Sequence, residues 1–379
     1  MSFPPRIAII GAGLAGLSLA RVLQLNDIYP TVYELDASPT SRNQGGTLDL
    51  HVESGQHALK VTGLWDEFQK LVRPHGQEFR LIDKYAKVLI GFESSDNTDN
   101  RPEVDRGSLR QILIDSIEAG TIHWGTRVKT VKPAAPTRGS STWTVVYKED
   151  QEATYDLVIG ADGAWSRIRP LLSDAQPTYA GVTFIETLFE NVDSKHPEIA
   201  ELVGQGNAFI VSDGQCLMAQ RNGDGSIRNY ATFRIAEQDF PELEFPDPAS
   251  ARAYLLTKFC NWDESLKDMI RKCDDTIIPR PIYALPASLT WKPVPGVTII
   301  GDAAHLMSPF AGEGANLAMY DGVELAATIA DAHKTGKDLH VGIAEFEQKM
   351  HNITSEKALE SAHNLQLFTS KETPQSIVD

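Results

Sequence analysis

The sequence is poor in cysteine. Only Cys216, Cys260 and Cys273 occur among 379 residues, and no two of them form a C-x-x-C pair. An odd, scattered set of this kind argues against a disulfide framework and gives no support to a zinc site. We therefore predict no metal site and three thiols without a chemical role.

Basic tracts and long apolar runs are also missing. The chain carries 35 Lys and Arg against 51 Asp and Glu, a net charge of −16, which argues against nucleic acid or an anionic membrane as a partner. The apolar stretch 7–20 is shorter than the roughly 18 residues of a transmembrane helix. Only one basic residue, Arg6, precedes it, which is too few for a signal peptide. We expect a cytoplasmic protein and a monomer.

That apolar stretch has an explanation in its glycines. The motif GAGLAG (11–16) lies between a predicted strand over 6–10 and a predicted helix over 14–26. In G-x-G-x-x-G spacing, the first glycine permits a tight turn, the second lets backbone approach a pyrophosphate, and the third lets the helix pack close to the strand. The helix N-terminus then offers free N–H groups to phosphates.

A second strand, predicted over 30–36, completes a β-α-β unit. It carries Glu34, eighteen residues after Gly16. A carboxylate at this point can accept both hydroxyls of an adenosine ribose and disfavours a 2′-phosphate. The unit is therefore predicted to bind FAD or NAD rather than NADP.

Two later stretches distinguish between these cofactors. DLVIGADGAWSRIR (156–169) reads as a buried strand that ends in Asp162-Gly163, and GDAAHLMSPFAGEGAN (301–316) follows a strand-like run over 296–300. With GAGLAG they form an ordered set that resembles the flavin-dependent aromatic hydroxylases with the p-hydroxybenzoate hydroxylase fold. The resemblance implies FAD as the bound cofactor and NADPH as a transient reductant, since no second dinucleotide-binding unit follows residue 40.

The resemblance also gives the late stretch a role. Asp302 would accept hydrogen bonds from the ribityl hydroxyls of FAD, and Pro309 with Phe310 would shape a turn against the flavin ring. Gly312 and Gly314 would clear room for that approach. The helix that begins there would point its positive end at the flavin pyrimidine, where reduced flavin is negatively charged.

Four local strings are similar to the tetracycline-inactivating flavin monooxygenases. They are GGTLDLH (45–51), RPEVDRGSLR (101–110), NWDE (261–264) and the stretch 301–316. This resemblance implies that Asp49, Arg110 and Asp302 contact FAD, and that Arg42 contacts nicotinamide or flavin. The complete predicted cofactor set is Gly11, Gly13, Ala15, Gly16, Glu34, Arg42, Asp49, Arg110, Asp162, Asp302, Pro309, Gly312, Gly314, Ala315 and Asn316.

The predicted fold is α/β, with a Rossmann-like FAD-binding domain, a mainly β substrate domain and a long C-terminal bracing helix. Helices are expected near 54–71 and after Asp105, which would cap the second of them. Phe346, Met350, Ile353, Leu359, Ala362 and Leu365 recur at helical spacing and predict the bracing helix. The predicted domains are 1–73, 98–171 and 282–340 for FAD, 74–97 and 172–281 for substrate, and 341–379 for the helix.

The substrate is expected to be held in the β domain. Candidates for the pocket wall are Glu186, Arg228 and Phe233 in the β domain, with Pro309 and Phe310 from the late stretch. Ordinary strand positions are an alternative explanation for the first three. The resemblance implies a tetracycline or another polycyclic aromatic, such as an aromatic polyketide, as substrate.

The activity implied by the resemblance is NAD(P)H-consuming hydroxylation. Reduced flavin would take up O2 to form a C4a-hydroperoxide, and an electron-rich phenol or enol carbon would attack its distal oxygen. A dry pocket would protect that species, and no catalytic side chain is predicted. Whether the reductant is NADPH or NADH, and whether the role is antibiotic resistance or biosynthesis, stays open.

Three other functions remain possible at this stage. A flavin-dependent halogenase shares the fold, but its W-x-W-x-I-P signature is missing, since Trp262 and Trp291 stand in other contexts. An NAD dehydrogenase would leave the stretches at 156–169 and 301–316 unexplained. A non-enzymatic flavin-binding protein is compatible with all the motifs.

Overall fold

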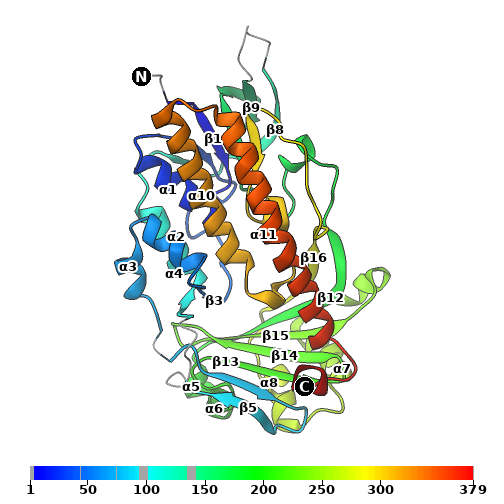
Figure 1. The fold of residues 1–379 in the computed structure, drawn as a ribbon. Helices are drawn as coiled ribbons and strands as arrows, with labels where there is room; N and C mark the ends of the chain where they lie inside the picture. Colours follow the sequence, from blue (N-terminus) through cyan, green and yellow to red (C-terminus); the bar gives the residue numbers. More distant parts are fainter. Residues whose placement is uncertain (1–3, 43, 74, 94–100, 135–141, 379) are drawn as a thin grey trace.

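The computed structural model describes residues 4–42, 44–73, 75–93, 101–134 and 142–378. Within them, a five-stranded sheet and a seven-stranded sheet form two layers of structure that long helices connect (Figure 1). No helix in these ranges is long and apolar enough to cross a membrane. The mixed α/β architecture predicted from the sequence is confirmed.

The five-stranded sheet is built from the first and last parts of the chain. Its order is β17-β11-β1-β2-β7, with parallel pairing throughout. The strands are β1 (Ile7–Ile10), β2 (Thr31–Tyr33), β7 (Ile122–His123), β11 (Leu157–Gly160) and β17 (Val297–Ile299). β1, β11 and the edge strand β17 are buried along their whole length, as expected for a parallel sheet covered on both faces.

Two helices from opposite ends of the chain pack together on this sheet. They are α1 (Leu14–Gln24) and α10 (Gly314–Thr335). A Cβ at Gly322 of α10 would lie 2.5 Å from the backbone oxygen of Ala15, so glycine is required for this close contact. The first and last motifs of the sequence are therefore fixed against each other.

The seven-stranded sheet has the order β16-β12-β15-β14-β13-β4-β5. Its strands are β4 (Phe79–Ile82), β5 (Val88–Phe92), β12 (Thr178–Phe189), β13 (Asn207–Ser212), β14 (Gln215–Arg221), β15 (Ile227–Arg234) and β16 (Ile277–Ala284). We call the face that carries Phe184, Met218 and Tyr230 the inner face, because these residues cluster with Phe310 and Leu365. The outer face packs on four helices: α5 (Val192–Lys195), α6 (Pro197–Val203), α7 (Pro248–Lys258) and α8 (Glu264–Arg271).

The bracing helix, α11, spans Leu339–Phe368 and runs beside α10 to reach the seven-stranded sheet (Figure 1). Phe346 and Met350 join the core of the five-stranded sheet, and Leu365 joins the inner-face cluster. Of the apolar positions that predicted this helix, Ile353, Leu359 and Ala362 are exposed. The buried contacts come instead from polar residues, such as Ser361, whose hydroxyl bonds to Ser308.

Two local predictions were wrong in detail. The helix expected over 54–71 is two helices, α2 (Gly55–Val61) and α3 (Trp65–Gln69), because Gly63 adopts a left-handed φ of 72° between them. Asp105 does precede α4 (Arg106–Asp115), but its carboxylate accepts the N–H of Gly223 instead of capping the helix. The side chain thus ties α4 to the turn between β14 and β15.

The remaining elements are short. They are β3 (Thr47–Asp49) paired with β6 (Glu103–Asp105), the sheet of β8 (Val128–Pro133), β9 (Trp143–Tyr147) and β10 (Gln151–Tyr155), the helix α9 (Asp302–His305), the 3-10 turns η1 (Arg169–Leu171), η2 (Glu237–Leu243) and η3 (Pro309–Ala311), and α12 (Gln375–Val378). The domain division stated above stays a proposal, and β16 crosses its boundary between residues 281 and 282. Its boundary residues 74, 97 and 98 lie outside the described residues.

Candidate functional site

The candidate cofactor site lies at the carboxyl edge of the five-stranded sheet. Because the strands are parallel, the residues that follow β1, β2, β11 and β17 meet at this edge. These residues are Gly11, Glu34, Asp162 and Asp302. The structure therefore brings together the three motifs that are far apart in the sequence.

The glycines of the first turn have different physical reasons. Gly11 has a φ of 109°, and a Cβ there would lie 2.2 Å from the oxygen of Ala161. A Cβ at Gly16 would lie 2.1 Å from the oxygen of Gly11. At Gly13, by contrast, no heavy atom of the described residues, chain neighbours aside, lies within 4 Å of the added Cβ. The fold requires the first and third glycines, whereas the second faces open space in front of α1.

Glu34 and Arg110 hold this turn from its two sides. The carboxylate of Glu34 is buried and accepts the N–H of Ala12 at 2.6 Å and that of Asp36 at 2.8 Å. The side chain of Arg110 is also buried and donates Nε to the oxygen of Ala12 at 3.0 Å. Arg110 therefore supports the glycine turn directly.

Arg42 lies on the outer rim of the same region. Its Nε is 3.0 Å from Asp36, and 62% of its side chain is exposed. Asp36 also lies 3.8 Å from Arg110, so the acid connects the rim to the turn. Ala15 is buried in the contact between α1 and α10, facing Gly301.

The central motif places a partly unpaired carboxylate at the edge. Oδ2 of Asp162 accepts the N–H of Arg167 at 2.7 Å, while Oδ1 is buried without a hydrogen-bond partner among the described residues. Burial raises the pKa of Asp162, and hydrogen bonds from Ser166 and nearby backbone only partly offset this. An acceptor left in this state fits a ligand that donates hydroxyl groups.

Arg169 was missed by the sequence analysis. It is 1% exposed, and it donates to the oxygen of Ala164 at 2.8 Å and to that of Ala303 at 3.0 Å. The guanidinium therefore joins the central motif to the late motif. No periodicity or spacing signals this role, because the accepting oxygens belong to the backbone.

A buried ion pair between Asp321 and His305 stabilises the late motif, 301–316. Asp321 of α10 accepts the N–H of Gly301 at 2.9 Å and contacts Nε2 of His305 at 2.6 Å. Burial opposes the charge on His305, but Asp321 outweighs it and raises the pKa of that imidazole. Asp302 itself makes no side-chain hydrogen bond or ion pair within the described ranges, and its carboxylate is available to a ligand.

The side chain of Asn316 makes its hydrogen bonds within the protein. Its side chain is fully buried, accepts the N–H of His51, and donates to the oxygens of Asp49 and Gly312. It therefore positions the turn before α10, and its amide is already used. In the same turn, Gly312 has a φ of 66°, and no heavy atom lies within 4 Å of an added Cβ at Gly314.

Alternating charges run beside this turn. His51 contacts Asp49 through Nε2 at 3.0 Å and Glu313 through Nδ1 at 3.2 Å, and Glu313 continues to Lys357 of α11 at 3.0 Å. Arg101 approaches Asp49 at 4.0 Å. Burial alone would lower the pKa of His51, but the two carboxylates outweigh it and raise the pKa to about 9. His51 is therefore a cation at neutral pH.

Replacing His51 with glutamine is expected to show this cation in the pH dependence of stability. Because the folded pKa of about 9 lies above the ordinary value of 6.5, the stabilisation is complete below pH 6.5 and is lost as the pH rises to about 9. The wild-type advantage in unfolding free energy should be on the order of 3 kcal/mol at the acidic end.

Denaturant unfolding from about pH 5.5 to about pH 9.5 measures this difference. His57→Gln is the matched control, since its ring is 42% exposed on α2 and its partner Glu324 is exposed as well. It should change the unfolding free energy by no more than about 0.5 kcal/mol at any pH. A wild-type advantage over His51→Gln that stays constant or grows with pH would contradict the assignment.

The predicted substrate residues divide between two faces. Glu186 and Arg228 lie on the inner face, where Glu186 stands opposite Tyr230 in the β12–β15 register and contacts Arg228. Phe233 is on the outer face, packed with Tyr254 of α7 at 6.1 Å between ring centroids. The structure does not bring Phe233 to the other candidates, and we set it aside as a pocket residue.

Phe310 connects the late motif to the inner face. Its ring centroid lies 5.8 Å from that of Phe184, and Phe184 lies 5.7 Å from Tyr230. Pro309 is exposed at the start of the same turn. An aromatic surface thus extends from the turn before α10 to the strands that carry Glu186 and Arg228.

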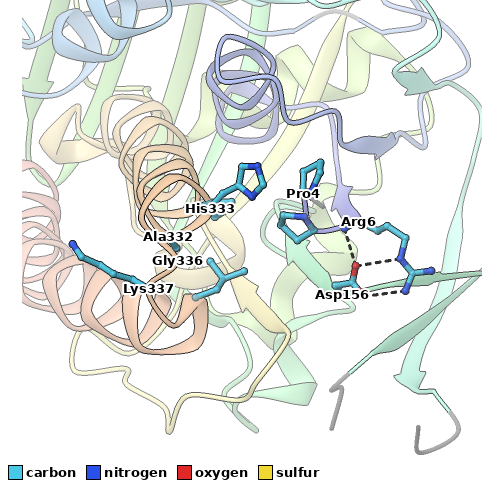
Figure 2. A pocket seen from close by; sticks show the side chains of 10 residues that line it. Pro4, Arg6, Asp156, Ala332, His333, Gly336 and Lys337 are labelled. Atoms are coloured by element: carbon cyan, nitrogen blue, oxygen red, sulfur yellow. Dashed lines mark hydrogen bonds and ion pairs between the residues drawn. The ribbon is translucent and has the colours of Figure 1, made fainter. Parts of the chain in front are cut away.

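A surface hollow at the opposite edge of the sheet is separate from this site. Its volume is about 470 Å³, and its lining includes Arg6, Asp156, His333 and Lys337 (Figure 2). Arg6 and Asp156 precede β1 and β11 and form an ion pair at 2.9 Å. The hollow therefore lies at the amino ends of these strands, away from the glycine turns.

The fold and the glycine turns together define a dinucleotide-binding protein. A family model described as an FAD binding domain matches residues 6–272 and 292–355. Monooxygenase penA of Penicillium thymicola is 33% identical over 368 residues, covering 85% of this chain and 84% of that protein. Monooxygenase asqM of Emericella nidulans is 32% identical, with 86% and 84% coverage.

Solved structures agree on the fold. Klebsiella pneumoniae HpxO, complexed with FAD and uric acid, superposes with a TM-score of 0.79 at 22% identity, covering 98% of this chain and 91% of that one. Tetracycline destructase Tet(55) superposes with a TM-score of 0.74 at 20% identity, with 99% and 93% coverage. The chain belongs to the family that this FAD-binding-domain model describes. It is an FAD-dependent monooxygenase.

Proposed function

We propose that this enzyme hydroxylates a polycyclic aromatic or enolic substrate at the expense of NADPH and O2. The observation that carries the proposal is the aromatic surface of Phe310, Phe184 and Tyr230, which links the proposed flavin turn to the inner face. Such a surface suits a flat ring system. The relative penA, named a monooxygenase, supports the reaction class.

The residues at the sheet edge fit FAD. A dinucleotide with a ribityl chain would use the open space at Gly13 and Gly314. It would also use the buried oxygen of Asp162 and the carboxylate of Asp302, which have no hydrogen-bond partner in the part of the chain that the structure describes. Bound FAD, once reduced by NADPH, supplies the activation of dioxygen. We assign the adenosine end of FAD to Gly11, Gly13 and Glu34. The isoalloxazine end is assigned to Gly312 and Gly314.

The protein's own part is to bind, orient and exclude water. Asp302 would hold ribityl hydroxyls, and the positive end of α10 would stabilise negative charge at the flavin pyrimidine. Arg169 and Asp321 fix the backbone from which these groups project. Asp49 borders Gly312, since its Oδ1 would lie 3.3 Å from a Cβ there. No side chain is needed as a base in this scheme.

A substrate screen tests the proposed function. The purified protein is expected to contain FAD, to oxidise NADPH faster with an aromatic ligand, and to transfer one oxygen atom from isotopically labelled dioxygen to it. Tetracycline and aromatic polyketides belong in the screen, as does NADH as the alternative reductant. A chloride-dependent halogenated product would favour a halogenase, and flavin binding without any oxygenated product would favour a binding protein.

A further inference from the structure

A group of positive charges lies on the inner face of the seven-stranded sheet. Arg228 of β15 and Arg280 of β16 flank Glu186 of β12. Together with Arg106 of α4, these two arginines exert a positive electrostatic effect on the hydroxyl of Tyr230. We call these five residues the basic cluster. Three positive charges against one negative charge leave a surplus of two, in a chain whose net charge is −16.

The single carboxylate is shared between two arginines. One oxygen of Glu186 accepts from Arg228, and the other accepts from Nε of Arg280 at 2.9 Å. The side chains of Glu186 and Arg228 are 8% and 6% exposed, so this pair is buried. Arg280 is 54% exposed, and its Nη groups donate to no acceptor within the described residues. The Nη groups of Arg280 therefore remain as guanidinium donors beyond those that bond to Glu186.

Tyr230 adds a neutral donor to the same place. Burial raises the pKa of its hydroxyl, and the charges of Arg228, Arg280 and Arg106 only partly oppose this, so the phenol keeps its proton. The hydroxyl makes no hydrogen bond to any described residue. It lies 3.6 Å from the position of a Cβ at Gly46.

The loop before β3 covers the cluster with two glycines. A Cβ at Gly46 would lie 2.7 Å from Oε1 of Gln220 and 3.6 Å from Cδ of Arg228, and one at Gly45 would lie 3.8 Å from Cδ of Arg106. The same loop leads to Asp49 beside the proposed flavin turn. The cluster thus lies close under the loop that connects the inner face with the cofactor edge.

We propose that the basic cluster binds an ionised acidic oxygen of the substrate, either an enolate or a carboxylate on a planar ring system. The inference rests on the proposed function and adds a substrate class to it. A guanidinium binds an oxyanion through charge-assisted, often paired, hydrogen bonds. Glu186 orients Arg228 and Arg280, and the phenol of Tyr230 supplies a further donor. The Nη groups of Arg280, whose side chain is 54% exposed, are the donors within reach of such a ligand.

Matched pairs of planar probes test the proposal on the FAD-loaded enzyme. We choose 4-hydroxycoumarin with 4-methoxycoumarin for an acidic enol, and 2-naphthoate with its methyl ester for a carboxylate. Dissociation constants are measured from the change in flavin absorbance. In at least one pair, the wild-type enzyme is expected to bind the anion at least about tenfold more tightly than the neutral probe.

Variants separate charge recognition from folding. Arg280→Gln should reduce the preference to about threefold or less, and Arg280→Lys should keep an intermediate preference because the charge remains. Arg271→Gln is the matched control, since Arg271 on α8 has comparable exposure and is paired with Glu264 and Asp268 away from the inner face. It should leave the preference unchanged. We avoid Arg228, whose removal would leave Glu186 buried with one partner fewer.

The outcomes separate this proposal from the proposed function. Equal affinity for both members of every pair, absence of binding by all four probes, or a full preference in Arg280→Gln would overturn the anion site. If neutral probes bind equally well and stimulate NADPH oxidation, the monooxygenase function stands without it. A protein that neither retains FAD nor oxidises NADPH would contradict the proposed function itself.

Discussion

Replacing Gly13 with alanine is expected to abolish tight FAD binding while leaving the apoprotein as stable as the wild type. Gly13 precedes α1 with a φ of −80°, which alanine adopts freely. Apart from its two chain neighbours, no described residue has a heavy atom within 4 Å of the new methyl group. In the proposed complex the pyrophosphate occupies that space. We expect a melting temperature within about 2 °C of wild type and a rise in the FAD dissociation constant of at least about tenfold.

Gly16→Ala is the contrasting variant. Its methyl group would lie 2.1 Å from the oxygen of Gly11, so α1 must move away from the turn. This variant should lose on the order of 2 kcal/mol of stability or more, with or without FAD. Thermal unfolding and fluorescence titration with FAD distinguish the two patterns. Wild-type FAD affinity in Gly13→Ala would show that no pyrophosphate lies at this turn.

The second large effect is expected at Asp302. Its carboxylate has no hydrogen bond or ion pair among the described residues, so Asp302→Ala should fold normally. Loss of hydrogen bonds from a charged acceptor to ribityl hydroxyls should raise the FAD dissociation constant about tenfold to a hundredfold. Asp302→Asn keeps one acceptor oxygen and should fall between alanine and wild type. The flavin content of the purified variants measures the effect.

The control for Asp302 is an acid near the other end of α10, away from the proposed flavin turn. Asp331→Ala removes one negative charge from the exposed side of α10, where Asp331 pairs with the exposed Lys337 at 2.8 Å. A surface pair of this kind contributes little, and flavin content should stay at the wild-type level. Equal flavin content in Asp302→Ala and Asp331→Ala would remove Asp302 from the cofactor site.

The parts of the site that the sequence predicted are those encoded locally. Glycine spacing reports a turn between a strand and a helix, and Glu34 follows the next strand at a fixed distance. Arg169 and Asp321 were not found, because they act on Ala303 and Gly301 through contacts that only the tertiary fold creates. The bond between Asn316 and His51, 265 positions earlier in the chain, is likewise a tertiary contact that no local pattern predicts.

The sequence does not show which residues of the seven-stranded sheet face the proposed substrate pocket. Strand β15 is buried on both faces, so no alternation of polar and apolar residues reveals which side chains point inward. Phe233 is therefore indistinguishable from an inner-face residue by pattern alone, although it packs against α7. In α11, the hydroxyl pairing of Ser361 with Ser308 similarly replaces the apolar contact that the spacing predicted.

The most direct test of the central claim is a crystal structure of the FAD-loaded enzyme. The account predicts the pyrophosphate within hydrogen-bonding distance of the turn at 11–13, the ribityl chain at Asp302, and the isoalloxazine ring against Gly312 and Gly314. Flavin density elsewhere on the molecule, or with its two ends reversed along the sheet edge, would contradict it.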